Sequence, residues 1–458
     1  MPLSAGETAS GVWFDNTAQL AWLAGSLLNG STSSPRVWTI DGANTVSSLQ
    51  LGLLPGGSNA VGVRFSEDGQ YVVGFGDSSS GSSAKPARWT KGAWNTPQGT
   101  GQLPGVTDSQ GTGVSTSGTV VGPSSAATVW TSTNGLLALP GIPGLFANLG
   151  TSFDISSTAA VIVGSAVWPD GSVGAAQWQQ GGSGYEINLL ASPYSKTSAT
   201  FCVSPDGHLV GGIMPHASGT TVACIWEDGG LFTLRDGTGA NLPGGVTATT
   251  DDGAAFGYGN FGGLQQATLW HPALGQDAIA LDDYYTLHAG VAPPTSFQLI
   301  QYGIAVNDSY HLVVYGDNGL SYYVAVPSVS SSGGWHNAGP GSPGISGTPW
   351  LSGRGSLSAN SSVALDLINA SPSSPGFLVF GIAAIHTPFK NGVMVPAVTA
   401  PSGTFLPLMT NSAGGVSLSG TWPVGVPSGL TTWSQYWIVD ATQLSGFSSS
   451  NALASTMP

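Results

Sequence analysis

Short runs of alternating apolar and polar residues, each broken by a polar turn, recur along the first 330 residues. A period of two indicates β-strands. Asp-Gly, Ser-Gly and Asn-Asp pairs between such runs accept the backbone conformation of a tight turn, so each stretch predicts a β-hairpin. The seven stretches are VWFDNTAQLAWLAG, VRFSEDGQYVVGFG, GVSTSGTVVG, FDISSTAAVIVG, FCVSPDGHLVGG, TATTDDGAAFGYG and IAVNDSYHLVVYG.

An aromatic residue follows each hairpin, on a further short strand. The aromatic residues are Trp38, Trp89, Trp130, Trp178, Trp226, Trp270 and, in a seventh copy, Tyr323. A fourth short apolar run follows in most copies. Four strands in each of seven repeats predict an all-β chain that begins with a seven-bladed β-propeller. Because a blade buries its faces only against its neighbours, we expect these aromatic residues to pack between blades.

The seventh copy lacks a fourth strand, because the sequence after YYVAVPS turns into SVSSSGG. Two segments could complete that blade. The N-terminal arm, residues 1–9, could return and close the ring. Alternatively, the arm could leave the body and pair with the open edge of another subunit, which is β-strand addition. The sequence leaves both alternatives open.

The repeat ends at residue 328, and the composition then changes. Residues 329–343 are rich in Ser, Gly and Pro, which predicts a linker between domains. Seven short alternating runs follow in residues 344–458, among them GFLVFGIAA and TTWSQYWIVD. They predict a smaller antiparallel β-sandwich domain.

Both parts of the chain resemble known bacterial families. The hairpin-and-tryptophan pattern resembles the HAF-type repeat of extracellular proteins, most closely in SEDGQYVVGFG with PARWT and SPDGHLVGG with ACIWE. The last segment resembles a C-terminal domain of secreted planctomycete and myxobacterial proteins, through GTPWLSGRGSL, VSLSGTWPVGVPSG and SQYWIVDATQLSGFSSSNALAST. The family's cysteine pair near the domain start is absent here. These resemblances imply secretion and an accessory β-module, with no established catalysis.

Charge and composition exclude several classes of partner. The net charge is −14 and only nine residues are Lys or Arg, so no basic surface is available for nucleic acid. Apolar runs are far shorter than the roughly 20 residues of a membrane helix, so no membrane span is predicted. With 7% charged residues and many Ser, Thr and Gly, the chain is typical of an extracellular or cell-surface protein. Its first ten residues, MPLSAGETAS, do not form a signal peptide.

Few residues suggest chemistry. Ser204, Asp206 and His208 lie within five positions and suggest an active site, but the other copies change these residues, which favours a hairpin turn. No spacing of His, Cys or acidic residues predicts a metal site, and we predict no cofactor and no catalytic residue. Cys202 and Cys224 fall on the first and third strands of one blade, too far apart for a favoured disulfide. Asn29, Asn307, Asn360 and Asn369 are candidate glycosylation sites.

Three functional hypotheses follow. The first is a non-enzymatic extracellular structural protein that self-assembles, as a homo-oligomer or homopolymer, into a fibre or surface layer. The second is a secreted, adhesin-like propeller that binds a carbohydrate or a peptide, with aromatic residues stacking on a glycan. The third is an enzyme of the glycosidase or lyase type, which the fold alone does not favour.

Overall fold

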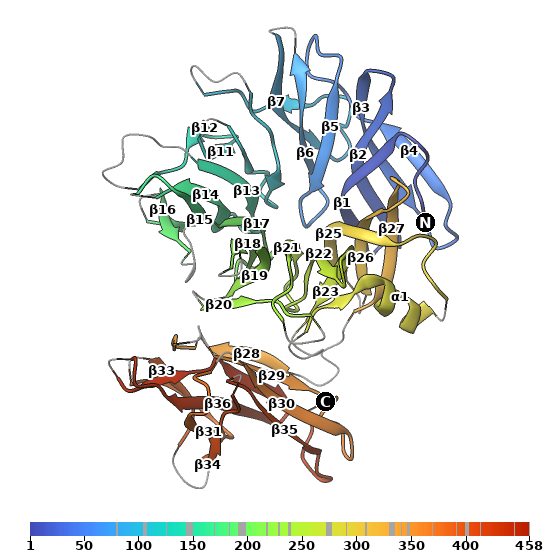
Figure 1. Ribbon diagram of the computed structural model, residues 1–458. Coiled ribbons are helices and arrows are strands. Elements are labelled where there is room, and N and C mark those ends of the chain that lie inside the picture. Colours follow the sequence, from blue (N-terminus) through green and yellow to red (C-terminus); the bar gives the residue numbers. More distant parts are fainter. Residues whose placement is uncertain are drawn as a thin grey trace. The chain divides into compact units, whose positions relative to one another are not determined.

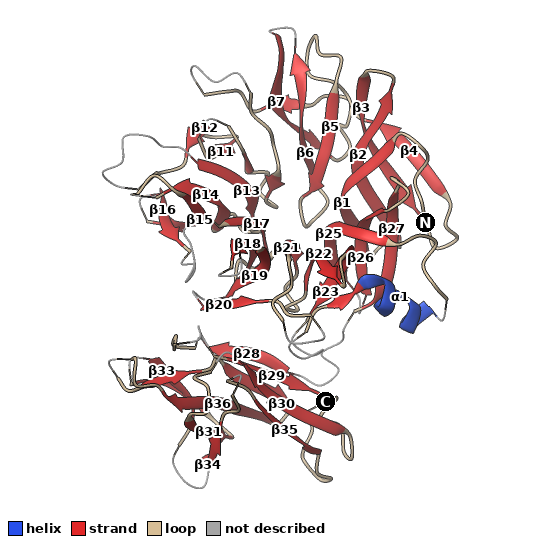
Figure 2. Cartoon of the chain, viewed as in Figure 1, coloured by secondary structure: helices blue, strands red, loops and turns tan. Residues whose placement is uncertain are grey.

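The chain is almost entirely β-structure, which confirms the all-β prediction (Figure 2). In the described residues the single helix is α1 (Leu281–Ala289). The computed structural model describes the whole chain except residues 79–80, 104–107, 125, 143–149, 169, 183, 191–197, 217–218, 228–229, 237–239, 272–276, 290, 307–308, 329–334, 340, 346–348, 369, 391, 399–402, 413, 444 and 458.

The chain forms two compact units. The first comprises Met1–Cys224, Leu242–Leu269 and Ile279–Ser328, and so contains most of the repeats. The second comprises Ile225–Asn241, Trp270–Ala278 and Val329–Pro458. Two short segments of the repeats therefore group with the C-terminal residues.

Seven antiparallel sheets follow one another in the described part of residues 1–328. In each, strands that are consecutive in the sequence are neighbours in the sheet. The first four sheets consist of β1 (Glu7–Asp15), β2 (Leu20–Asn29), β3 (Thr32–Ile40) and β4 (Val46–Gln50); β5 (Ala60–Phe65), β6 (Tyr71–Ser78), β7 (Gly81–Thr90) and β8 (Gln98–Gly99); β9 (Gly113–Val114), β10 (Val120–Gly122), β11 (Thr128–Thr131) and β12 (Gly135–Ala138); and β13 (Gly150–Ile155), β14 (Val161–Val167), β15 (Val173–Gly181) and β16 (Gly184–Leu189).

The remaining three sheets continue the same order. They consist of β17 (Ala199–Val203), β18 (Leu209–Pro215), β19 (Thr221–Glu227) and β20 (Gly230–Thr233); β21 (Gly244–Thr249), β22 (Ala255–Phe261), β23 (Leu264–Trp270) and β24 (Ile279–Ala280); and β25 (Phe297–Val306), β26 (Ser309–Gly316) and β27 (Ser321–Pro327). The first strand of each sheet contacts the first strand of the next, and β25 contacts β1 (Figure 1). The sheets thus surround a common axis, which is a β-propeller-like arrangement.

The N-terminal residues lie along the open edge of the seventh sheet. Pro2 forms an antiparallel bridge with Tyr322. The backbone N–H of Leu3 donates to the carbonyl of Ser321, and that of Tyr323 to the carbonyl of Met1, both at 2.9 Å. Leu3 is 4% exposed and belongs to the apolar cluster around Trp38. The part of this edge at Ser321–Tyr323 is therefore occupied by this chain's own N-terminal residues.

Three of the hairpin turns share one hydrogen-bond pattern. In each, a buried hydroxyl donates to the Asp two residues later, at 2.5–2.6 Å. The pairs are Ser66 with Asp68, Ser204 with Asp206, and Thr250 with Asp252. The Ser204 hydroxyl also accepts the N–H of Leu209 at 2.9 Å, and Asp206 accepts the N–H of His208 at 3.1 Å. Ser204 and Asp206 thus hold a turn together, as the repeat analysis predicts.

Replacing Gly207 with alanine is expected to lower the free energy of unfolding by about 1–3 kcal/mol. Gly207 ends its turn with φ +89°, and a Cβ there would lie 2.9 Å from Cγ2 of Val161. The matched control is G219A, since Gly219 has φ +81° but no atom within 4 Å of its Cβ position. Urea denaturation should show the larger loss for G207A. Equal losses would mean that the contact with Val161 does not matter.

The six repeated tryptophans are buried, at 0–5% exposure. Trp89 of the second sheet packs in a cluster with Val37 of the first sheet, and Trp178 of the fourth sheet packs in a cluster with Val129 of the third sheet. Their indole N–H groups donate to the carbonyls of Gly52 and Pro140, each at 2.8 Å. Both carbonyls belong to the connection that enters the tryptophan's own sheet. The indole therefore fills the space between sheets and also fixes the connecting backbone.

Tyr323 differs from these tryptophans in register. Trp89 lies opposite Val72 in its sheet. Val72 pairs with the second residue after the bulge in its sheet's first strand, and in the seventh sheet Leu312 has this place. The residue opposite Leu312 in β27 is Val324. Tyr323 is one residue earlier and so points to the other face. It is half-buried there, and its hydroxyl lies 2.6 Å from Nδ1 of His311.

The sheets of residues 329–458 pack around a separate apolar core. The main sheet has the order β28 (Trp335–Gly339), β38 (Ala452–Thr456), β36 (Thr431–Val439), β31 (Pro375–Gly381) and β34 (Gly403–Met409), with β37 (Phe447–Ser449) paired to β36; a second sheet contains β29 (Trp350–Arg354), β30 (Ser362–Ile368) and β35 (Val416–Thr421); and a hairpin contains β32 (Ala384–Phe389) and β33 (Gly392–Pro396). Leu351 and Leu367 of the second sheet share one cluster with Leu378, Tyr436 and Ile438 of the main sheet.

Two elements depart from the sequence predictions. Strand β28 lies inside residues 329–343, so the predicted linker is wrong for residues 335–339. Trp335 explains the strand, because its buried ring joins the core and its N–H donates to the carbonyl of Gly355 at 2.8 Å. Helix α1 is the second departure. Its first turn carries Asp282 and Asp283, which suit the positive end of a helix dipole.

Candidate ligand-binding mouth

A β-bulge recurs at one register position in the first strands of the sheets. It shifts the pairing between Gly62 and Arg64 in β5, and equivalently in β1, β13, β17, β21 and β25. A bulge bends its strand and redirects a side chain. We call the residues after these bulges the axial layer. They are Gly11, Arg64, Asp154, Cys202, Ala248 and Tyr302. The corresponding residue of β9 is Gly113, which lies opposite Val121 of β10.

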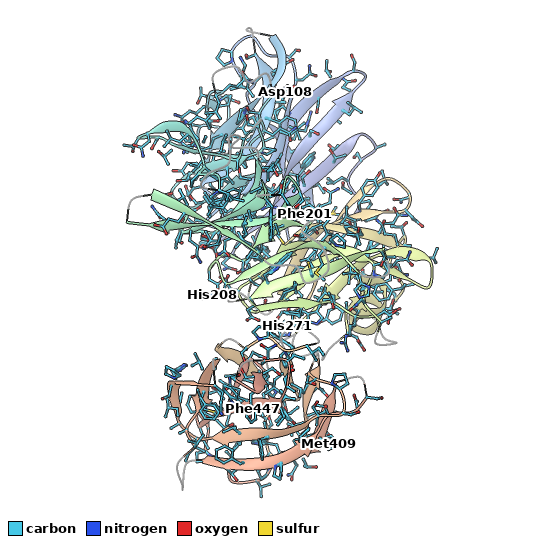
Figure 3. All side chains as sticks on the ribbon, turned by 60° about the vertical axis from the view of Figure 1, so that its left-hand side comes forward. Asp108, Phe201, His208, His271, Met409 and Phe447 are labelled. Carbon is cyan, nitrogen blue, oxygen red and sulfur yellow. The ribbon has the colours of Figure 1, made fainter. Side chains whose placement is uncertain are left out.

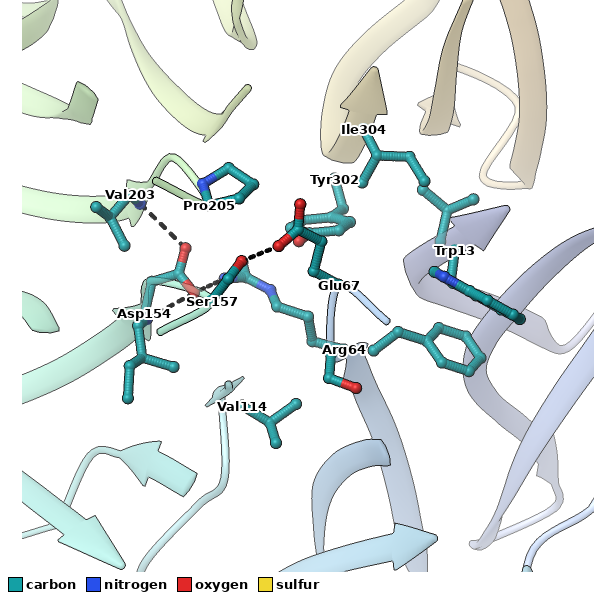
Figure 4. A pocket seen from close by; sticks show the side chains of 14 residues that line it. Trp13, Arg64, Glu67, Val114, Asp154, Ser157, Val203, Pro205, Tyr302 and Ile304 are labelled. Carbon is teal, nitrogen blue, oxygen red and sulfur yellow. Dashed lines mark hydrogen bonds and ion pairs between the residues drawn. The ribbon is translucent and has the colours of Figure 1, made fainter. Parts of the chain in front are cut away.

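An ion pair crosses the axial layer (Figure 4). Arg64 of the second sheet contacts Asp154 of the fourth, and both side chains are nearly buried. Asp154 also accepts the N–H of Val203 at 3.1 Å and that of Ile155 at 2.9 Å. The Arg64 guanidinium lies over the Tyr302 ring, 4.4 Å from its centroid. One cation thus links the second, fourth and seventh sheets across the axis.

The other polar groups of the axial layer are neutral at physiological pH. Burial, with a contribution from the negative charge of Asp154, raises the pKa of Cys202 to about 12. Burial also raises the pKa of Tyr302 to about 12. A thiol with such a pKa is not a nucleophile, because the reactive species is the thiolate. Cys202 and Cys224 are both buried free thiols, as their strand positions predict.

A cavity of about 620 Å³ opens beside the axial layer; we call it the mouth. The mouth is lined by residues 13–17, 67–68, 205, 249–252 and 302–306, which come from five sheets. A smaller hollow of about 30 Å³ contains Arg64 and Asp154 and shares Trp13, Glu67 and Tyr302 with the mouth. It has room for little more than one water molecule. Arg64 and Asp154 therefore lie in a hollow that adjoins the mouth but do not line the mouth itself.

The mouth is acidic. Its lining includes Asp15, Glu67, Asp68, Asp251 and Asp252, and none of the described lining residues is Lys or Arg. Burial, followed by repulsion from Asp206 and Glu67, raises the pKa of Asp251 to about 6. Burial is the larger cause of this shift, and the nearby carboxylates, whose negative charge a bound cation would offset, add to it.

Most mouth carboxylates already have one protein partner. Asp251 accepts the N–H of Asp206 at 2.9 Å, and Asp252 accepts the hydroxyl of Tyr310 at 2.9 Å. The carboxylate of Glu67, in the second sheet, accepts a hydrogen bond from the hydroxyl of Ser157, in the fourth sheet. Aromatic surface lies beside them in Trp13, Phe14 and Tyr302. These bonds fix the orientation of the carboxylates and leave other lone pairs for a ligand.

The sequence analysis did not identify the axial layer, although the repeat carried a signal for it. In five copies of the repeat, the residue two positions before the hydroxyl residue of the hairpin turn belongs to the axial layer or, in β9, corresponds to it. These residues are Arg64, Gly113, Asp154, Cys202 and Ala248. An equivalent position that is Arg in one copy and Asp in another is atypical of a purely apolar strand. The sequence does not reveal the bulge, however, and so it gives no indication that the side chains at this position meet.

The remaining sequence predictions concern surface and metal sites. Asn29 and Asn360 are exposed, whereas Asn307 and Asn369 lie outside the described residues. Among the described side chains, no group of three or more His, Cys, Asp or Glu is arranged to hold a metal ion. No helix in the described part of the chain is long and apolar enough to cross a membrane.

No family model matches the sequence, and no curated protein matches it. Among solved structures, the chain is similar to the BP39L lectin of Burkholderia pseudomallei, with 12% identity, a TM-score of 0.38, and coverage of 70% of this chain and 97% of the lectin. It is also similar to TolB of Acinetobacter baumannii, with 9% identity, a TM-score of 0.35 and coverage of 68% and 80%. The similarity to acylaminoacyl peptidase of Pyrococcus horikoshii has 9% identity and a TM-score of 0.38, and covers 81% of this chain and 59% of the peptidase. This chain therefore spans little more than half of the length of that protein.

Proposed function

We propose that this chain is a non-enzymatic extracellular binding protein, a seven-bladed β-propeller followed by a β-sandwich, whose mouth binds a basic peptide segment. The observation that carries the proposal is the 620 Å³ cavity lined by fixed carboxylates and aromatic rings, with no cationic lining residue among those described. A Lys or Arg side chain supplies both the charge and the hydrogen-bond donors that such a cavity lacks. Its alkyl stem would contact the apolar part of the lining. The Trp13 and Tyr302 rings already have Lys91 and Arg64 over one face each.

The electrostatics of the whole chain support the same ligand class. The net charge is −14, so the protein attracts cations before contact. Arg64, in the adjoining hollow, is already paired with Asp154 and does not offset the mouth carboxylates. A neutral carbohydrate would gain stacking and hydrogen bonds here but would not relieve the repulsion around Asp251. We therefore favour the basic peptide over the glycan.

We expect a fluorescein-labelled hexalysine peptide to bind the protein at pH 7.5 and low salt. The double variant E67Q/D251N removes two negative charges from the mouth and should weaken binding at least about tenfold. Affinity should also fall as the pH is lowered through about 6, because the raised pKa of Asp251 means that its carboxylate is protonated below that pH. Fluorescence anisotropy measures both effects.

Two comparisons separate binding in the mouth from general attraction to an acidic protein. E186Q removes a charge from the exposed face of β16, outside the mouth, and should leave affinity nearly unchanged. D251N should flatten the pH profile between 5 and 7.5. If E186Q weakens binding as much as D251N does, or if a glycan array gives binding while hexalysine does not, the proposed ligand is wrong.

A self-assembling fibre or surface-layer subunit is the second candidate function. Its N-terminal arm is not a free strand, since residues 1–3 pair with β27 of the same chain. The observation that favours assembly is a different one, a group of exposed apolar side chains on the main sheet of residues 329–458.

A further inference from the structure

The space between the two sheets of residues 329–458 is filled unevenly. At one end, Leu351 and Leu367 of the second sheet pack with Leu378, Tyr436 and Ile438 of the main sheet, and all five are at most 5% exposed. Side chains alternate between the faces of a strand, so residues two positions further along these strands face the same space. The residues at those positions decide whether the other end is filled as well.

At the other end, the main sheet presents small polar residues to this space. Ser434 precedes Tyr436 by two positions in β36, and Ser455 follows Leu453 by two positions in β38, so both serines lie on the core face. They are 1% and 2% exposed. A serine side chain is much smaller than the leucine and tyrosine side chains that fill the first end.

The second sheet is also small at this end. Gly420 follows Leu418 by two positions in β35 and lies opposite Val363 of β30, which places it on the core face. A Cβ at Gly420 would have no atom within 4 Å apart from its neighbours in the chain. Because Gly420 is exposed and the two serines are buried, the unfilled space runs inward from the surface.

This space is a pocket of about 210 Å³, which we call the inter-sheet pocket. Three aromatic side chains line it, Trp335 of β28, Phe380 of β31 and Trp422, which follows β35. None of the described lining residues is charged. None belongs to β34 either, the last strand of the main sheet, whose end is marked by Met409 (Figure 3). The pocket is therefore bounded by β28, β38, β36 and β31 on the side of the main sheet.

Two polar groups of the lining have no hydrogen-bond partner in the part of the chain that the structure describes. The hydroxyl of Ser434 forms no hydrogen bond there, although this buried residue lines the pocket. The indole N–H of Trp422 is also buried without an acceptor. The Ser455 hydroxyl, in contrast, lies 2.5 Å from that of Thr432. A ligand that bonds to Ser434 would remove the cost of an unsatisfied buried hydroxyl.

We propose that the inter-sheet pocket binds a phenolic ring, which is a neutral aromatic ring with one hydroxyl. An apolar cavity of about 150 Å³ holds a benzene molecule, so the 210 Å³ pocket has room for a ring with substituents. The aromatic lining favours a ring, since aromatic rings pack well against one another. The phenolic hydroxyl supplies the hydrogen bond that Ser434 lacks.

Other ligand classes fit this pocket less well. A charged group would be buried there without an opposite charge, because none of the described lining residues is charged. A sugar would bury several hydroxyls, of which Ser434 and Trp422 could satisfy only a few. The pocket thus differs in ligand class from the acidic mouth, and the proposal does not depend on binding of a basic peptide.

Titration of the full chain with p-cresol, followed by NMR of the ligand, tests the proposal. The wild-type protein should bind p-cresol with a Kd on the order of 0.1–1 mM, as expected for so small a ligand. G420L places a side chain in the pocket and should weaken binding at least about tenfold. Gly420 has no positive φ and open space at its Cβ position, so the fold should persist, which circular dichroism can verify.

G42L is the matched control and should leave binding unchanged. Gly42 of the first unit also has no positive φ and no atom within 4 Å of its Cβ position. S434A should weaken p-cresol binding about tenfold but leave binding of toluene, which has no hydroxyl, nearly unchanged. Hexalysine should not compete with p-cresol, so this proposal and the proposed ligand of the mouth can fail separately.

Two sources share the phenolic chemistry, a free phenol and the tyrosine side chain of a peptide. N-acetyltyrosinamide should bind as tightly as p-cresol if the source is a peptide, and at least about tenfold more weakly if it is a free phenol. Absence of p-cresol binding at about 5 mM would overturn the proposal. Equal p-cresol affinity in G420L and the wild type, or in S434A and the wild type, would overturn it too.

Discussion

Replacing Arg64 with methionine is expected to lower the free energy of unfolding by about 3–5 kcal/mol. The change removes the guanidinium but leaves Asp154 buried against the backbone N–H groups of Ile155 and Val203. A buried charge that has lost its partner is among the most unfavourable changes that a fold tolerates. The contact with the Tyr302 ring is lost as well. Urea denaturation followed by tryptophan fluorescence measures the loss.

The double variant R64M/D154L identifies the cause of that loss. It replaces both members of the pair by apolar side chains of similar size, and such replacements are often neutral or stabilising. We therefore expect it to recover most of the stability lost in R64M. If the double variant is as unstable as R64M, packing of the axial layer rather than the isolated charge is responsible.

Removing residues 1–4 is expected to destabilise the first unit by about 4–6 kcal/mol. Two backbone hydrogen bonds join Leu3 and Met1 to β27, and each contributes about 1 kcal/mol. Burial of Leu3 contributes about 2 kcal/mol more, and the apolar cluster around Trp38 loses one wall. The truncated protein would also expose the backbone of β27 as an open edge. Thermal and urea denaturation should both show the effect.

L3A is the graded control for the truncation. It keeps the backbone hydrogen bonds and removes only the side chain, so a loss of about 2–3 kcal/mol is expected. A truncated protein as stable as the wild type would show that the first residues do not hold the ring closed. Truncation should also promote association through β27.

The sequence could predict the hairpins and the repeated tryptophans because each depends on local pattern. The turn from Ser204 to Gly207 needs only a hydroxyl, an Asp and a residue that accepts positive φ, all within four positions. The spacing of Trp38, Trp89 and Trp130 follows from the repeat itself. These features do not depend on where the rest of the chain lies.

Other features depend on contacts that no local pattern contains. The Ser-, Gly- and Pro-rich segment around Trp335 resembles a linker until the indole finds a core formed by β29, β31 and β36. The offset between Tyr323 and Val324 appears only in the pairing of β27 with β26, which a spacing count does not detect. Arg64 and Asp154 are 90 residues apart in sequence, so their pairing follows only from the closed ring.

Pairing of the first residues with β27 imposes an order on biosynthesis. Met1 and Leu3 are synthesised more than 300 residues before their partners at Ser321 and Tyr323. At about 5–20 residues per second, the last edge of the ring waits roughly 15–60 seconds for its final strand. During that time the nascent chain carries an unpaired edge and an unfilled gap beside Trp38. The half-made protein, rather than the finished one, is therefore the form most exposed to proteases and to pairing with other chains.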